Sequence, residues 1–219
     1  MYKSNKDSPN PKFVGTHYLD DFDWFFIGGD DVFLLPYNLK AYMASLAYKD
    51  ETNPRTHDYY IGRRMNGGKK LGYFNYGGPG YALSQITLRR LLSALDDAKH
   101  CSANEQTPAE DVIIAKCLGY LGITFTDTRD AKGRERFFPF SPGWHYNFRS
   151  PGPPDQGAFF LYRMRRWKIL EGKDCCAPDS ISFHYIKQAS LVRHLHASSI
   201  IVMNMTKTKQ KLWSNLSLI

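Results

Sequence analysis

The sequence has few cysteines and no long hydrophobic run, and each shortage excludes a class of protein. Its 219 residues include four cysteines with no Cys-x-x-Cys spacing, which argues against a structural zinc site. The even count fits either disulfides formed in a secretory compartment or buried free thiols. No apolar run approaches the ~20 residues of a transmembrane helix, and no signal peptide opens the chain.

The chain also lacks a continuous stripe of basic residues, although its formal net charge is +8. Basic residues are scattered in pairs such as Arg63-Arg64 and Arg165-Arg166. Because no nucleic-acid-binding module is recognised either, nucleic acid is not an expected partner. The positive charge instead suits an anionic ligand such as a nucleotide-sugar diphosphate, or a negatively charged membrane surface.

The length and the aromatic content indicate a folded domain. A chain of 219 residues with 42% hydrophobic residues can bury one core or, at most, form two small domains. Residues 1–11 are polar and rich in Pro, Asn, Ser and Lys, which predicts a disordered segment. We assign residues 12–200 to one domain and residues 201–219 to a polar C-terminal tail.

An aromatic stretch followed by two glycines and two aspartates carries most of the functional argument. Trp24 to Ile27 has no polar alternation, which predicts a strand buried on both faces, with a neighbouring strand on each side. After the glycine turn, Asp30 and Asp31 lie at the carboxyl end of that strand, where open α/β sheets bind ligands. Their oxygens suit a divalent cation that holds a diphosphate. The alternative is an ordinary polar turn between two strands.

Apolar periodicity and start signals predict the other elements. Ser84 is expected to cap one helix, and Thr107 opens another with a capping box that ends at Glu110. Further helices are expected over 12–19, after Pro36 and over 188–197. Short strands are expected over 32–35, 59–62 and 180–186, the last containing His184, and residues 124–160 are expected to be rich in loops.

Several stretches, taken in order, resemble the family 31 glycosyltransferases, in particular the core 1 β1,3-galactosyltransferase branch. The matching segments are His17 to Phe26 with the acidic pair, Gly62-Arg63-Arg64, Tyr76-Gly77-Gly78-Pro79-Gly80-Tyr81-Ala82-Leu83-Ser84, Glu110-Asp111 with Cys117, Phe138-Pro139-Phe140, and Cys175-Cys176 with Ser182-Phe183-His184-Tyr185. Each motif is short, but six in the right order over roughly residues 12 to 190 are specific.

The resemblance implies an α/β domain of the GT-A type that transfers galactose from UDP-galactose, with Mn²⁺, to the 3-hydroxyl of N-acetylgalactosamine on Ser/Thr of a glycoprotein. The family's enzymes lie in the Golgi lumen as single-pass type II membrane proteins, and the resemblance allows a homodimer. The expected site residues are Asp31 and His184 as metal ligands, Asp111 as catalytic base, and Asp30, Gly77, Gly78 and Glu110 around the nucleotide sugar.

These residue types suit an inverting transfer. A carboxylate must take the proton from the incoming hydroxyl, and a cation stabilises the charge on the departing UDP. Asp111 is expected in the first turn of its helix, where the macrodipole favours the ionised form. The alternatives are that Glu110 and Asp111 only cap the helix, and that His184 is a half-buried strand histidine.

Two departures from the family pattern favour an alternative function. Gly29 stands where the family signature has its first Asp, and the family's first nucleotide-binding half and membrane anchor are not in this sequence. The chain is therefore expected to be either a fragment of an active transferase or an inactive member that binds a glycoprotein or partner chain. We also expect the chain alone to be poorly soluble or partly molten, because one edge of its sheet would be unpaired, and to transfer no galactose to a GalNAc-peptide.

The same resemblance makes a prediction for the cysteines. Cys101 and Cys117 match cysteines of the family branch, which implies that they form a disulfide. Cys175 and Cys176 are adjacent in the sequence and are not expected to pair with each other.

Overall fold

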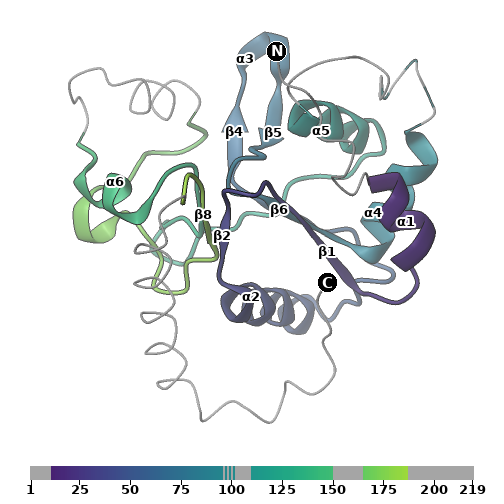
Figure 1. Ribbon diagram of the computed structural model, residues 1–219, viewed down its shortest axis with the longest axis horizontal. Coiled ribbons are helices and arrows are strands. Elements are labelled where there is room, and N and C mark those ends of the chain that lie inside the picture. The colour runs from purple at the N-terminus through teal and green to yellow at the C-terminus, as the bar shows by residue number, and fades with distance from the viewer. Residues whose placement is uncertain are drawn as a thin grey trace.

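The computed structural model describes residues 11–95, 97, 99, 101, 110–149 and 165–186 (Figure 1). The expected disordered segment, apart from Pro11, lies outside these residues. So do the Thr107 capping position, the helix expected over 188–197 and the C-terminal tail. The described residues form a mixed α/β structure with small sheets.

The central sheet has three antiparallel strands in the order β1-β6-β3. They are β1 (Trp24–Ile27), β6 (Tyr81–Ser84) and β3 (Tyr60–Gly62). Helix α2 lies on one face of this sheet, and α1, α4 and α5 lie on the other (Figure 1). The middle strand, β6, therefore has a neighbour on each side and helices above and below it.

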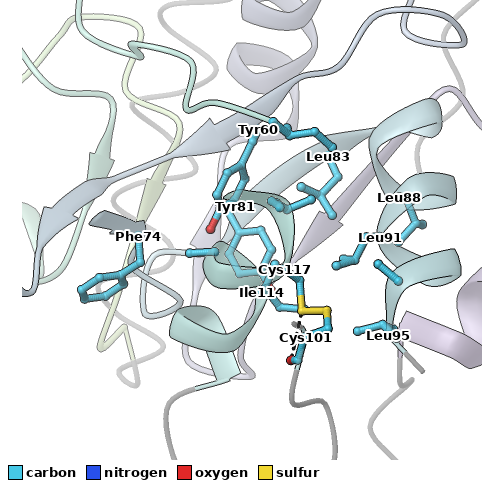
Figure 2. Packing of buried hydrophobic residues seen from close by; sticks show 14 of the residues in the cluster. Tyr60, Phe74, Tyr81, Leu83, Leu88, Leu91, Leu95, Cys101, Ile114 and Cys117 are labelled. Atoms are coloured by element: carbon cyan, nitrogen blue, oxygen red, sulfur yellow. Dashed lines mark hydrogen bonds between the residues drawn. A yellow bond between two sulfur atoms is a disulfide. The ribbon is translucent and has the colours of Figure 1, made fainter. Parts of the chain in front are cut away.

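Both faces of the central sheet are buried because successive residues point to opposite faces. Trp24, Tyr59, Ile61 and Ala82 share a core with residues of α2, namely Leu39, Tyr42 and Met43. The alternate residues face α4 and α5, in a core that contains Phe25, Tyr60, Tyr81, Leu83, Leu88, Leu91, Ile114 and Leu118 (Figure 2). This explains the absence of polar alternation in these strands.

The helices expected from periodicity are present. Their bounds are α1 Pro11–Tyr18, α2 Pro36–Lys49, α4 Gln85–Ala94 and α5 Glu110–Tyr120. Ser84 is the N-cap residue of α4, but its side chain does not cap the helix. Its Oγ accepts from the N–H of Tyr59 and donates to the carbonyl of His57, at 3.0 and 2.9 Å, so it joins β3 to α4 instead.

Two further small sheets flank the central one. Strands β2 (Phe33–Leu34) and β7 (Phe137–Phe138) both pair with β8 (Ser182–Phe183), the first antiparallel and the second parallel. Strands β4 (Arg64–Asn66) and β5 (Tyr73–Asn75) form a hairpin that encloses the short helix α3 (Gly68–Leu71). The expected strands at 32–35 and 180–186 are thus confirmed only as two-residue strands.

The stretch predicted to be rich in loops, 124–160, is mostly irregular over its described residues, 124–149, and contains the short strand β7 and the helix α6 (Pro142–Asn147). Pro142 at the first helical position suits a helix start. The side chain of Ser141 also accepts a hydrogen bond from the N–H of Trp144 at 3.4 Å, so a short helix forms despite the prolines and glycines around it.

The unpaired sheet edge expected from the sequence is present in the described part of the chain, where Trp24–Ile27 has one neighbouring strand. There, β1 pairs with β6 and forms the edge of the sheet. Its first two residues are buried and its last two are half-buried. The strand is apolar because helices cover both of its faces, and a second neighbouring strand is not needed to explain its composition.

Both pairs of cysteines are disulfide-bonded. The bond between Cys101 and Cys117, expected from the family resemblance, lies in the core beside α4 and α5 (Figure 2). Cys175 and Cys176 are bonded to each other, so the prediction that they do not pair is wrong. They follow the 3-10 helix η1 (Gly172–Asp174), and a bridge to Glu135 holds Cys176 in place; the turn there brings the two neighbouring sulfurs together.

None of the described helices has the length and the apolar composition required to cross a bilayer.

Candidate active site

The short β2–β8 pairing brings Asp31 and His184 together, although they are far apart in the sequence. Phe33 lies opposite Phe183 in this antiparallel pair, and the N–H of Ile186 donates to the carbonyl of Asp31 at 3.1 Å. Asp31 therefore lies just before β2, and His184 just after β8, at the same end of the ladder. The carboxylate of Asp31 therefore lies beside an imidazole from another strand, which an ordinary polar turn would not require.

Asp31 and His184 form a close, half-enclosed pair. Nε2 of His184 lies 3.2 Å from Oδ1 of Asp31, and their side chains are 11% and 17% exposed. A carboxylate and an imidazole at this separation form a mixed oxygen and nitrogen donor pair, which suits a transition-metal ion such as Mn²⁺. In the described part of the chain, no third His, Cys, Asp or Glu joins them in a metal-binding group.

The glycine-rich loop after β5 separates this pair from Asp111. The N–H of Gly77 donates to Oδ2 of Asp111 at 2.8 Å. A side chain at Gly78 would place its Cβ 2.5 Å from Nδ1 of His184, a distance at which something must move. Glycine at these two positions lets the backbone lie between the histidine and the aspartate. The structure therefore brings together five of the expected site residues, namely Asp31, Gly77, Gly78, Asp111 and His184.

Asp111 is buried in the first turn of α5. Its two carboxylate oxygens accept hydrogen bonds from the backbone N–H groups of Gly77 and Val112. Burial raises the pKa of Asp111 above its ordinary value, and these hydrogen bonds only reduce the rise. The expectation that the helix start holds the carboxyl in its ionised form is thus outweighed by desolvation, which makes Asp111 a stronger base than an exposed aspartate.

Glu110 is tied to the core by a different contact. Its Oε1 accepts a hydrogen bond from the hydroxyl of the buried Tyr81 at 2.7 Å. Burial raises the pKa of Glu110, the Tyr81 hydrogen bond lowers it, and the charge of Asp111 raises it further. The carboxylate of Glu110 therefore has a structural partner at the start of α5.

Asp30 is exposed on the turn beside Asp31. Among the described residues it takes part in none of the hydrogen bonds or ion pairs of the site. Its role at the nucleotide sugar stays a prediction.

Two tyrosines at the site were not singled out by the sequence analysis. Tyr185 stacks on His184 with ring centres 3.8 Å apart and is half exposed, with a φ of 59°. Tyr76 is hydrogen-bonded to Tyr185, and burial, that partner and the carboxylates of Asp111 and Asp31 raise its pKa. Tyr76 thus lies within electrostatic reach of both carboxylates. Both tyrosines stand inside the motifs quoted above, which was the only signal for them.

The comparisons with known proteins agree with the motifs. No protein-family model matches the chain. The glycoprotein-N-acetylgalactosamine 3-beta-galactosyltransferase 1 of Xenopus laevis is 33% identical over 176 residues, which cover 80% of this chain and 44% of that protein. The chain is a relative of the family 31 glycosyltransferases.

Two weaker likenesses point to the same family. Chondroitin sulfate synthase 3 of Mus musculus is 30% identical over 122 residues, 52% of this chain and 13% of that protein. Chondroitin sulfate glucuronyltransferase of Homo sapiens is 31% identical over 105 residues, 47% of this chain and 12% of that protein. The chain thus spans less than half the length of these family 31 relatives. Their shared chemistry supports a glycosyl-transfer function for it.

Proposed function

We propose that this chain carries the metal ligands and the catalytic base of an inverting, GT-A-type galactosyltransferase. It would transfer galactose from UDP-galactose to the 3-hydroxyl of N-acetylgalactosamine on Ser/Thr of a glycoprotein, as part of a longer Golgi protein. The observation that carries this proposal is the loop of Gly77 and Gly78, which joins a buried carboxylate on one side to a His–Asp pair on the other. The name and identity of the Xenopus relative support the choice of sugar and acceptor.

In this proposal Asp111 takes the proton from the acceptor hydroxyl. Burial raises its pKa, so the carboxylate binds a proton more readily than an exposed aspartate does. The N–H of Gly77 fixes Oδ2 in position and leaves lone pairs on both oxygens. This chain thus contributes to the proton transfer in two ways. A backbone hydrogen bond orients the carboxylate of Asp111, and burial makes that carboxylate more basic.

Asp31 and His184 would hold the metal ion. Their mixed donor set fits Mn²⁺, and the diphosphate of the donor and water would complete its shell. When bound, the ion supplies positive charge that stabilises the departing diphosphate. Gly78 lets the rings of His184 and Tyr76 pack against the loop backbone, because a Cβ there would lie 2.5 Å from Nδ1 of His184 and closer still to Cε1 of Tyr76. Tyr185 fixes the orientation of the imidazole by stacking on it.

A transfer assay and a binding assay test the proposal together. The 219-residue chain, alone and joined to the first nucleotide-binding half of a family relative, is incubated with Mn²⁺, UDP-galactose and a GalNAc-peptide, and the product is identified by mass and linkage. We expect product from the joined protein and none from the chain alone. In parallel, calorimetry measures Mn²⁺-dependent UDP binding by the chain and by His184→Ala, with the exposed Asp21→Asn as the control. We expect His184→Ala to abolish binding and Asp21→Asn to retain it. Unchanged UDP affinity in His184→Ala would remove this metal site from consideration.

A further inference from the structure

A basic and aromatic surface lies outside the candidate active site, around Trp167. The guanidinium carbons of Arg129, Arg64 and Arg166 lie 3.9, 5.6 and 5.9 Å from the centre of a ring of Trp167. We call these four residues, with Tyr73, the Trp167 cluster. None of them takes part in the contacts of Asp31, His184 or Asp111 described above.

Three segments that are distant in the sequence form the Trp167 cluster. A bridge between Met65 and Arg165 places the 165–167 segment beside β4. Arg64 of β4 donates a hydrogen bond to the carbonyl of Phe125 at 3.1 Å, and Arg166 lies over the ring of Tyr73 at 5.1 Å. Arg166 and Tyr73 are exposed, so the cluster reaches the surface of the β4–β5 hairpin.

The positive charge of the cluster is only partly compensated. Arg129 donates to both oxygens of Asp127, from Nε at 3.0 Å and from Nη2 at 2.7 Å. Within the described ranges, no ion pair involves Arg64 or Arg166. Burial lowers the pKa of Arg64, and the charge of Arg166 lowers it further. Like charges held this close destabilise one another, and an anion bound between them would remove that cost.

The arrangement of the Trp167 cluster favours binding of an anionic group over stacking of a sugar ring. Arg129 already covers a face of Trp167 at 3.9 Å, so that face is not open to a stacked sugar. Guanidinium groups bind carboxylates through two parallel hydrogen bonds. In an extended peptide, alternate side chains lie on one face, and acidic residues spaced in that way match two neighbouring guanidinium groups.

We propose that the Trp167 cluster binds an acidic, extended polypeptide segment of the acceptor protein through its Asp and Glu side chains. The identity of that protein as the acceptor rests on the proposed function, whereas binding of the acidic segment does not require transfer. The cluster would thereby select glycoproteins whose modified Ser or Thr is close to acidic residues.

Direct binding is measured without any donor sugar. The probe is a labelled peptide in which five Glu residues alternate with Gly, titrated with the full 219-residue chain by fluorescence anisotropy. Arg166→Gln should raise the dissociation constant about fivefold, because one charge-assisted contact is lost, and should weaken the dependence on salt. The matched control is Lys49→Gln, which removes one positive charge from exposed α2 on the far side of the central sheet.

The outcomes separate this proposal from its competitors. An equal loss of peptide affinity in Arg166→Gln and Lys49→Gln would overturn the proposal, since binding would then depend only on the net charge of the protein. Unchanged affinity in both variants would also overturn it, since the peptide would then not bind at the cluster. Chondroitin sulfate is titrated in the same way. If Arg166-dependent binding occurs with that polysaccharide and not with the peptide, the occupant is an anionic glycan and the proposal is wrong.

A kinetic comparison links the surface to the proposed function. With a GalNAc-peptide flanked by Glu residues, Arg166→Gln should raise KM and leave kcat unchanged. With a neutral GalNAc-peptide, neither constant should change. If the chain joined to the first nucleotide-binding half of a family relative transfers no galactose to either peptide, the proposed function fails, while the anisotropy result for the acidic peptide still decides on the Trp167 cluster.

Discussion

At the scale of single residues, the feature that matters most is a carboxylate buried where its charge is costly. Asp111 accepts two backbone hydrogen bonds and still has a raised pKa. A carboxyl whose pKa is raised in the folded state stabilises the fold most at low pH, and that contribution is lost as the pH rises through the raised value. At neutral pH the ionised group therefore costs stability, which a purely structural residue would not be expected to do.

Replacing Asp111 with Asn should separate activity from stability. The amide cannot take a proton, so transfer should fall at least about a hundredfold, as is usual when a general base is lost. The melting temperature should change little at neutral pH, because removal of a buried charge offsets the weakened hydrogen bond from Gly77. Transfer assays and thermal unfolding measure the two effects. Near-normal transfer by a folded Asp111→Asn protein would show that this carboxylate is not the base.

The raised pKa also predicts a pH profile. Transfer requires ionised Asp111, so the rate should fall as the pH drops through a pKa higher than that of an ordinary aspartate. Mn²⁺-dependent UDP binding measured across the same pH range is the control, because it reports on Asp31 and His184 and not on the base. A rate that stays constant down to the ordinary range of an exposed aspartate would contradict the effect of burial.

Gly29 offers a second test at this scale. A Cβ at this position would meet Oδ1 of Asp31 at 3.4 Å, an ordinary contact, so a side chain fits beside the carboxylate. Gly29→Asp should raise Mn²⁺ affinity about tenfold, since carboxylate charge tunes the affinity of such sites. Gly29→Asn has the same size without the charge and should not. Equal gains in both variants would show that the change acts through the loop and not through a metal ligand.

At the scale of elements, the long helices could be predicted from the sequence and the two-residue strands could not. Helices α2 and α4 were predictable because their apolar residues repeat every three or four positions. The two-residue strands β2 and β8 have no period to detect, yet their pairing is what places Asp31 next to His184. The order of the family motifs identified both residues without showing that they meet. Ser84 was placed correctly at the start of α4, but its bonds to β3 depend on tertiary contacts.

The disulfide between Cys101 and Cys117 should stabilise the start of α5. It closes a loop with a sequence separation of 16, which contributes about 3 kcal/mol by restricting the unfolded chain. The double variant Cys101→Ala with Cys117→Ala should lower the free energy of unfolding by about that amount, measured by urea denaturation. Cys175→Ala with Cys176→Ala is the control: that disulfide joins adjacent residues and closes no loop. An equal loss in the two double variants would refute the role of loop closure.

At the scale of the whole molecule, the sheet has one edge that the described residues leave unpaired. Strand β6 bonds alternately to its two neighbours: the N–H of Ser84 donates to Tyr59 and that of Gln85 to Asp23. With Trp24 opposite Ser84, Asp23 and Phe25 point their backbone groups toward β6. The N–H and C=O groups of Trp24 and Phe26 therefore point away from the sheet. An apolar strand with open backbone groups is a site for pairing with another chain.

We expect the 219-residue chain to self-associate through this edge, and a pair of variants at Phe26 tests the mechanism. Phe26→Pro removes the outward N–H and leaves the bonds to β6 intact, because proline lacks that donor and is tolerated on edge strands. Phe26→Ala removes the same ring but keeps the N–H. Light scattering over a range of concentrations should show less association for Phe26→Pro than for Phe26→Ala. If the two variants associate equally, the ring of Phe26 drives the contact, and strand pairing at β1 is not its cause.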